Sequence, residues 1–197
     1  MDLRHSYTLI APVYDAFLAS ATRAARQRSL AQLPVEPARV LLAGVGTGLD
    51  LPLLPSQHAY IGLDLTSAML RRTATQQRPP DFRPVQGDAQ RLPFADRCFD
   101  QVILHLILAV VPDPLACLQE ASRVLASGGQ VLIFDKFLVP GQRAPLRRLL
   151  NPLVRRVATR FDVVFEELLR QTPSLGLESD HPALAGGWFR LIRLRRK

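Results

Sequence analysis

Short apolar runs that end in glycine or aspartate alternate with helical patterns along this chain, and this alternation strongly limits the folds open to it. It is typical of a parallel sheet that helices cover on both faces. Five such runs predict strands, at 39–43, 59–63, 82–86, 100–105 and 130–134. The 197 residues contain no internal repeat and fit one domain. The sequence therefore predicts a single α/β domain.

Capping residues and helix breakers mark the segments between these runs. The N-cap residue Thr66 begins a helix from Ser67 to about Gln77, and Asp113-Pro114 begins a second helix that ends at Ser127-Gly128-Gly129. The C-terminal part predicts a basic helical stretch at 143–160, a short helix at 162–170, and strands at 177–182 and 188–194 that form a hairpin around Gly186-Gly187.

Composition bears on location and partners. The formal net charge is +8, mostly from arginine, which either attracts polyanions or simply faces water. Cys98 and Cys117 lack the spacing of metal ligands, so no metal site is expected. No apolar run reaches the roughly 18 residues that span a bilayer, and the first residues do not resemble a secretion signal. We therefore expect a cytoplasmic protein; nothing in the sequence indicates an oligomeric state.

The segment Gly44-Val45-Gly46-Thr47-Gly48 follows the first predicted strand, where missing side chains let the backbone approach a ligand closely. Asp64 lies 20 residues after Gly44, at the end of the next strand, where a carboxylate can accept hydrogen bonds from both ribose hydroxyls. A nicotinamide dinucleotide and S-adenosylmethionine both contain such a ribose. The G-x-G-x-G spacing, and Asp50 where a pyrophosphate would bind, favour a cofactor without phosphates.

These glycines, together with Gly62-Leu63-Asp64, Gly87-Asp88-Ala89, Leu92-Pro93-Phe94 and Phe99-Asp100, resemble the ordered motifs of class I S-adenosylmethionine methyltransferases. The resemblance covers about residues 39–134. It implies a Rossmann-like α/β fold, with a seven-stranded, mostly parallel sheet, an antiparallel terminal strand and helices on both faces.

The resemblance also implies a binding site for S-adenosylmethionine. The loop of Gly44, Val45, Gly46, Thr47 and Gly48 would hold the methionine and ribose, and Asp64 would bind the ribose hydroxyls. Leu65 and Met69 would pack against the adenine. Asp88 would accept a hydrogen bond from the adenine amino group, and the Ala89 backbone would contact the ring. One departure concerns Leu42, because the family usually has an acidic residue there. Either another group serves the methionine ammonium, or cofactor affinity is reduced; a non-catalytic cofactor-binding module is then an alternative.

Narrower resemblances point to the acceptor. Residues 6–15 resemble the N-terminal lid of a subgroup that contains quinone C-methyltransferases and bacterial phospholipid N-methyltransferases, which implies that Tyr7 and Tyr14 approach the sulfonium. The alternative is that both tyrosines pack on one helix face. Residues 110–114 and 187–193 are more similar to the phospholipid enzymes. The expected acceptor is small or lipid-like. The most specific prediction is N-methylation of phosphatidylethanolamine, and the alternative is C-methylation of a quinone precursor. The chain then divides into a lid (1–33), a cofactor-binding core (34–136) and a C-terminal part (137–197).

Candidate catalytic residues are few. His105 ends the fourth predicted strand, near the methyl group, and is either a proton acceptor or a core histidine. Tyr14 is a second candidate that would orient the acceptor, and Lys136 could meet a headgroup phosphate. No serine–histidine–acid set stands out.

The interaction surface is a separate question. The basic amphipathic stretch 143–160 predicts either contact with an anionic inner membrane face or simple packing on the sheet. A nucleic-acid acceptor is not expected, because His105-Leu106-Ile107-Leu108 replaces the Asn/Asp-Pro-Pro-aromatic motif used for amine methylation of bases.

Overall fold

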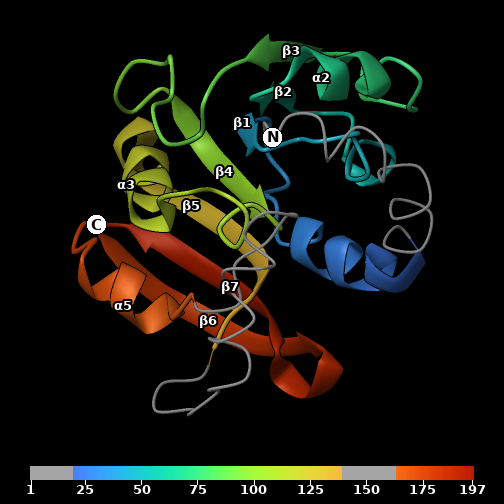
Figure 1. Ribbon diagram of the computed structural model, residues 1–197. Helices are drawn as coiled ribbons and strands as arrows, with labels where there is room; N and C mark the ends of the chain where they lie inside the picture. Colours follow the sequence, from blue (N-terminus) through green and yellow to red (C-terminus); the bar gives the residue numbers. More distant parts are fainter. Residues whose placement is uncertain (1–19, 139–162) are drawn as a thin grey trace.

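The computed structural model describes residues 20–138 and 163–197 (Figure 1). The predicted lid at 6–15, with Tyr7 and Tyr14, and the basic stretch at 143–160 lie outside the described residues.

The described residues form one sheet of seven strands in the order β3-β2-β1-β4-β5-β7-β6. The first five strands in the chain run parallel to one another, and β7 pairs antiparallel with both β5 and β6. The expected mostly parallel sheet with an antiparallel end is therefore confirmed. The strands are β1 (Arg39–Ala43), β2 (Ala59–Asp64), β3 (Phe82–Gln86), β4 (Phe99–His105), β5 (Leu125–Lys136), β6 (Leu175–Leu184) and β7 (Phe189–Arg196).

Different helices cover the two faces of this sheet. One face packs on α3 (Pro114–Val124) and α5 (Phe165–Arg170), through the largest apolar cluster of the described residues. The other face packs on a helix at 20–30 and on the 3-10 turn η1 (Leu51–Leu53). Figure 1 shows helix 20–30 on one side of the sheet and α3 with α5 on the other. Central strands covered in this way are apolar on both faces, which explains their continuous apolar sequence.

The predicted helices that begin at Ser67 and after Asp113 exist but are shorter than expected. The Thr66 hydroxyl accepts a hydrogen bond from the Met69 amide at 3.4 Å, yet α2 (Ser67–Thr73) gives way to turns well before Gln77. Asp113 caps α3 as predicted, with its Oδ1 accepting from the Leu115 and Ala116 amides.

The end of α3 was predicted wrongly. The helix ends at Val124, ahead of the glycines, and β5 begins at once with Leu125. Leu125 is fully buried and pairs with Phe99 of β4, so the sheet draws this residue into an extended conformation. Tertiary burial thus overrides the local glycine stop signal.

The C-terminal hairpin is present and longer than predicted. Its strands β6 and β7 join through the turn η2 (Ala185–Gly187), where Gly186 and Gly187 both have positive φ. In the described parts of the chain, no helix has the length and apolar character needed to cross a membrane.

Candidate active site

The carboxyl ends of β1, β2 and β3 meet at one edge of the sheet. The backbone amides of Gly44 and Val45 both donate to the Leu63 carbonyl, at 2.8 and 2.9 Å, and so tie the glycine loop to the end of β2. The Gly87 amide donates to the Asp64 carbonyl at 3.0 Å and ties the segment after β3 to the same place. Three loops that are far apart in sequence therefore form one continuous rim, as expected for ligand sites of parallel sheets.

Two glycines of the loop explain why side chains are excluded there. Gly44 has φ +78°, and a Cβ on it would lie 2.3 Å from the Cδ1 atom of Ile107. Gly46 has φ +56°, but no described atom lies within 4 Å of a Cβ placed there. Neighbouring packing therefore requires the first glycine, whereas the second presents bare backbone to open space, which suits a close-fitting ligand.

Asp64 faces this loop. Its Oδ2 accepts from the Gly46 amide at 3.0 Å, and its Oδ1 accepts from the Thr66 amide at 3.0 Å. The half-buried carboxylate is thus fixed beside the open space, with further lone pairs for a ribose diol. Leu65 follows with 49% of its surface exposed, and Met69 in α2 is half-buried, so apolar surface is available for a flat ring.

Asp88 and Ala89 complete the rim after β3. The Asp88 carboxylate accepts from the Gln90 amide at 2.9 Å and from the Gln90 side-chain nitrogen, which fixes its orientation. Ala89 is buried beneath it. The structure thus brings the predicted cofactor residues Gly44 to Gly48, Asp64, Leu65, Met69, Asp88 and Ala89 to one edge of the sheet.

Leu42 lies behind the glycine loop in an apolar cluster. It is 2% exposed and packs with the buried residues of helix 20–30 and of β4, among them Leu30 and Ile103. The leucine side chain therefore offers no polar atom to the methionine ammonium at this end of the site.

A buried polar network stands next to the apolar cluster. Asp50 Oδ1 accepts from Arg26 Nη1 at 2.8 Å and from His105 Nδ1 at 3.0 Å. The opposite ring atom, His105 Nε2, lies 2.9 Å from the Ser29 hydroxyl. All four residues are between 1% and 6% exposed.

The charges in this network can be assigned. Burial alone raises the pKa of Asp50, but attraction to His105 and Arg26 holds that pKa well below its usual range. Asp50 is therefore an ionised carboxylate, which can only accept hydrogen bonds, so His105 Nδ1 carries a hydrogen. The sequence places the charge of Asp50 where a pyrophosphate would bind, and the structure shows that its side chain points inward to Arg26 and His105.

The network also assembles a serine–histidine–aspartate set that sequence reasoning missed. Its members lie far apart in the chain, with Ser29 and His105 separated by 76 positions, and no spacing signal connects them. Ser29 is 1% exposed, so its hydroxyl cannot reach a substrate. The set has the bonds of a hydrolase triad without the access that a nucleophile needs.

A second carboxylate, Asp135, lies buried at the carboxyl end of β5. Its Oδ2 accepts from the Ala109 amide at 3.1 Å, and its Oδ1 accepts from the Lys136 amide at 2.8 Å. Burial raises the pKa of Asp135 to about 6. The side chain holds the segment after β4 against β5. Burial also lowers the pKa of the neighbouring Lys136 side chain.

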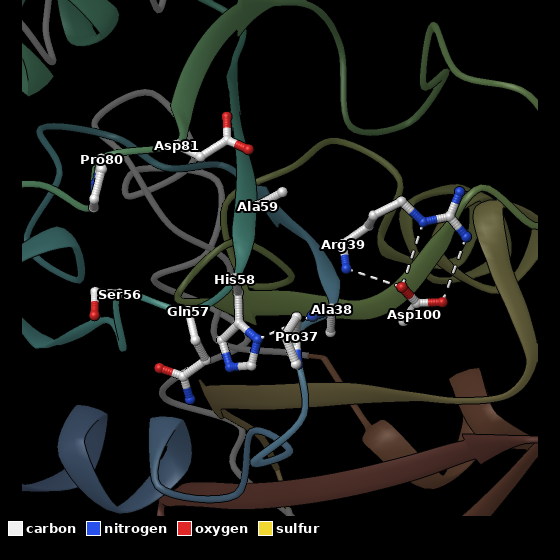
Figure 2. Close-up of a pocket in the computed structure, with 10 residues that line it drawn as sticks. All are labelled: Pro37, Ala38, Arg39, Ser56, Gln57, His58, Ala59, Pro80, Asp81 and Asp100. Atoms are coloured by element: carbon white, nitrogen blue, oxygen red, sulfur yellow. Dashed lines mark hydrogen bonds and ion pairs between the residues drawn. The ribbon is translucent and has the colours of Figure 1, made fainter.

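A pocket opens at the opposite edge of the sheet, around the amino ends of β1, β2 and β4 (Figure 2). There Arg39 forms an ion pair with Asp100, and His58 Nδ1 accepts from the Ala38 amide at 3.1 Å. Because the glycine loop, Asp64 and Asp88 all lie at the carboxyl edge, this pocket is not the cofactor site. Within the described residues, no group of three or more histidine, cysteine, aspartate or glutamate side chains could hold a metal ion.

Comparison with known proteins agrees with this geometry. Residues 41–133 match the family described as "Methyltransferase domain". A phosphatidylethanolamine N-methyltransferase of Cereibacter sphaeroides is 31% identical over 190 residues, which cover 94% of this chain and 93% of that protein. A demethylmenaquinone methyltransferase of Mycobacterium sp. (strain KMS) is 35% identical over 159 residues, covering 75% and 67%.

A solved S-adenosylmethionine-dependent methyltransferase of Thermotoga maritima has the same fold, with a TM-score of 0.73 and 21% identity over the whole of both chains. The glycine loop with its open space at Gly46, and the carboxylates at the ends of β2 and β3, fit the same cofactor. The chain therefore belongs to the S-adenosylmethionine-dependent methyltransferases, and S-adenosylmethionine is its cofactor.

Proposed function

We propose that this methyltransferase methylates the amine of a phosphatidylethanolamine headgroup. The observation that carries the proposal is the extent of similarity to the Cereibacter sphaeroides enzyme, which covers 94% of this chain and 93% of that protein. The demethylmenaquinone methyltransferase is slightly more identical but covers only 75% and 67%. Similarity that covers nearly the whole length of both proteins is the better guide to the acceptor, because the common cofactor core occupies only part of each.

The chemistry requires alignment more than acid–base strength. When bound, S-adenosylmethionine supplies a methyl group activated by its sulfonium. Asp64 would hold the ribose, and Leu65, Met69, Asp88 and the Ala89 backbone would hold the adenine. The loop from Gly44 to Gly48 would hold the methionine end and so fix the direction from which the acceptor amine approaches. Exclusion of water then favours transfer over side reactions.

The amine must lose a proton before or as it attacks. Both ring nitrogens of His105 are bonded inside the protein, at 3.0 Å to Asp50 and 2.9 Å to Ser29, so bulk water, before the amine enters the site, is the better acceptor. By the resemblance, Tyr7 and Tyr14 orient the amine near the sulfonium. Lys136, at the carboxyl end of β5, would meet the headgroup phosphate. The basic stretch 143–160 would contact the anionic inner face of the membrane.

The test is lipid analysis in a bacterial host whose membranes contain phosphatidylethanolamine but none of its methylated forms. Expression of the chain should produce mono-, di- or trimethylated ethanolamine lipids, detected by mass spectrometry. Asp64→Ala should abolish them, whereas Asp81→Ala, the same change at the amino edge of the sheet, should not. Unaltered lipids from a well-folded protein that binds S-adenosylhomocysteine would refute the proposed acceptor.

C-methylation of a quinone precursor is the second candidate, favoured by the 35% identity to the mycobacterial enzyme. The same cultures distinguish the two. A quinone that gains a methyl group, with unaltered ethanolamine lipids, would favour this candidate.

A further inference from the structure

We propose that Asp50 is a positioning residue for the cofactor: through His105 and Arg26 it fixes the downstream end of the glycine loop. It thereby supports the methionine end of the site, where Leu42 offers no polar group. This proposal concerns the cofactor site and does not depend on which acceptor is methylated.

The chain after the glycine loop needs such an anchor. The stretch between β1 and β2 is fully described and contains only one short helix, the 3-10 turn η1. Asp50 is the N-cap residue of η1, a position where an aspartate usually bonds the first amides of the helix. Within the described residues its side chain makes no such bond and is directed instead to Arg26 and His105. The carboxylate therefore connects the loop to the rest of the protein instead of stabilising the turn.

The carboxyl end of β4 holds the loop at two points. Ile107 fills the space above Gly44, where a Cβ would meet its Cδ1 atom at 2.3 Å. His105, two residues earlier, bonds Asp50, which lies two residues beyond the last glycine of the loop. Contacts at both ends fix a segment whose glycines would otherwise be free to move. A loop held in its binding geometry before the ligand arrives costs less ordering on binding.

Helix 20–30 supplies the third support. Arg26 Nη1 bonds Asp50 at 2.8 Å, and Arg26 Nε donates to the Thr22 hydroxyl at 3.0 Å, so the guanidinium is fixed on its own helix. Ser29, on the same helix, bonds the far side of the His105 ring. Asp50 and His105 are thus held between the helix and the end of β4. This arrangement gives His105 a structural purpose that requires neither exposure nor proton transfer to an acceptor.

Two substitutions at position 105 test the proposal directly. Asparagine can place an N–H near the position of Nδ1 and keep the bond to Asp50, whereas glutamine places its amide nearer the position of Nε2 and toward Ser29. His105→Asn should therefore bind S-adenosylhomocysteine nearly as the native protein does in calorimetry. His105→Gln should bind about tenfold more weakly, in line with the loss of one hydrogen bond to a charged group.

The two variants also distinguish this role from proton acceptance. If His105 took the proton from the acceptor, both variants would keep native affinity for S-adenosylhomocysteine and both would lose kcat. If His105 were only a packing residue, the two variants would bind equally. Either outcome would overturn the proposal.

A second experiment removes the ion pair without leaving an unpaired charge. The double variant Arg26→Met with Asp50→Leu replaces the pair by apolar side chains, which buried sites often tolerate. Melting followed by circular dichroism should show a cooperative transition, and the affinity for S-adenosylhomocysteine should fall by about tenfold or more. A folded double variant with native affinity would overturn the proposal. If the double variant does not fold, the comparison of His105→Asn with His105→Gln tests the proposal alone.

Discussion

Asp135 should make the stability of this protein decrease as the pH rises from about 4 to about 6. The carboxyl is completely buried at the end of β5, and burial raises its pKa from 3.8 to about 6. Between these pH values the folded chain keeps a proton that the unfolded chain releases. Stability due to this group is therefore complete below about pH 4 and is lost as the pH rises to about 6.

The size of the effect follows from the same values. A tenfold change in proton affinity corresponds to about 1.4 kcal/mol, so a rise from 3.8 to about 6 gives about 3 kcal/mol. That is a large part of the 5–15 kcal/mol that roughly describes a whole domain. The group is fully buried, so solvent does not screen the effect appreciably.

Urea unfolding, followed by circular dichroism at half-unit steps from pH 4 to pH 7, measures this dependence. The native protein and Asp135→Asn should be compared, because the amide cannot titrate but has a similar shape. Burial lowers the pKa of His58 and gives the opposite trend in the same range, but it is common to both proteins and cancels in the difference. The difference in the free energy of unfolding should change by about 3 kcal/mol. Parallel curves would refute the reasoning.

Three further outcomes test the cofactor site and its surroundings. Gly44→Ala should abolish binding of S-adenosylhomocysteine in calorimetry, because its Cβ would overlap Ile107; adding Ile107→Ala should restore binding only partly, since φ +78° still strains alanine. Asp64→Ala should weaken binding at least tenfold with little change in melting temperature, whereas Asp81→Ala should leave both unchanged; equal effects would contradict the assignment. Gly62→Ala should lower the free energy of unfolding by about 1–3 kcal/mol, measured in urea, because its Cβ would lie 2.6 Å from an aromatic ring of β3.

Most of the fold could be predicted from sequence because local signals and burial agree. The centre of β4, Val102 to Leu104, is apolar and buried on both faces, and Asp113-Pro114 caps α3 as its chemistry requires. Prediction was wrong at the start of β5, where the burial of Leu125 outweighs the glycines that follow. A short stretch of sequence around α3 contains its N-cap residue but not β4, the strand with which Leu125 pairs.

The cofactor rim could be predicted for a similar reason. The glycine loop and Asp64 each end a strand, and neighbouring parallel strands bring their ends together. The network of Asp50, Arg26, Ser29 and His105 could not be predicted, because its members come from three elements and their spacing in the sequence follows no helix or strand periodicity. In the sequence, Asp50 is interpreted from its position just after the glycine loop, whereas its partners lie 24 and 55 positions away in the chain.

Helix 20–30 has a consequence for where this chain can be cut. The segment from 34 to 136 contains the whole predicted cofactor core, yet one face of its central strands is covered by Leu30 and Leu33 from outside that segment. A fragment that begins at residue 34 would expose the apolar cluster around Leu42 to water and leave Asp50 without Arg26. Such a fragment should aggregate or remain partly unfolded. The unit that can be moved between proteins, permuted or minimised therefore begins no later than residue 20, because helix 20–30 covers one face of the sheet and belongs to the folded domain.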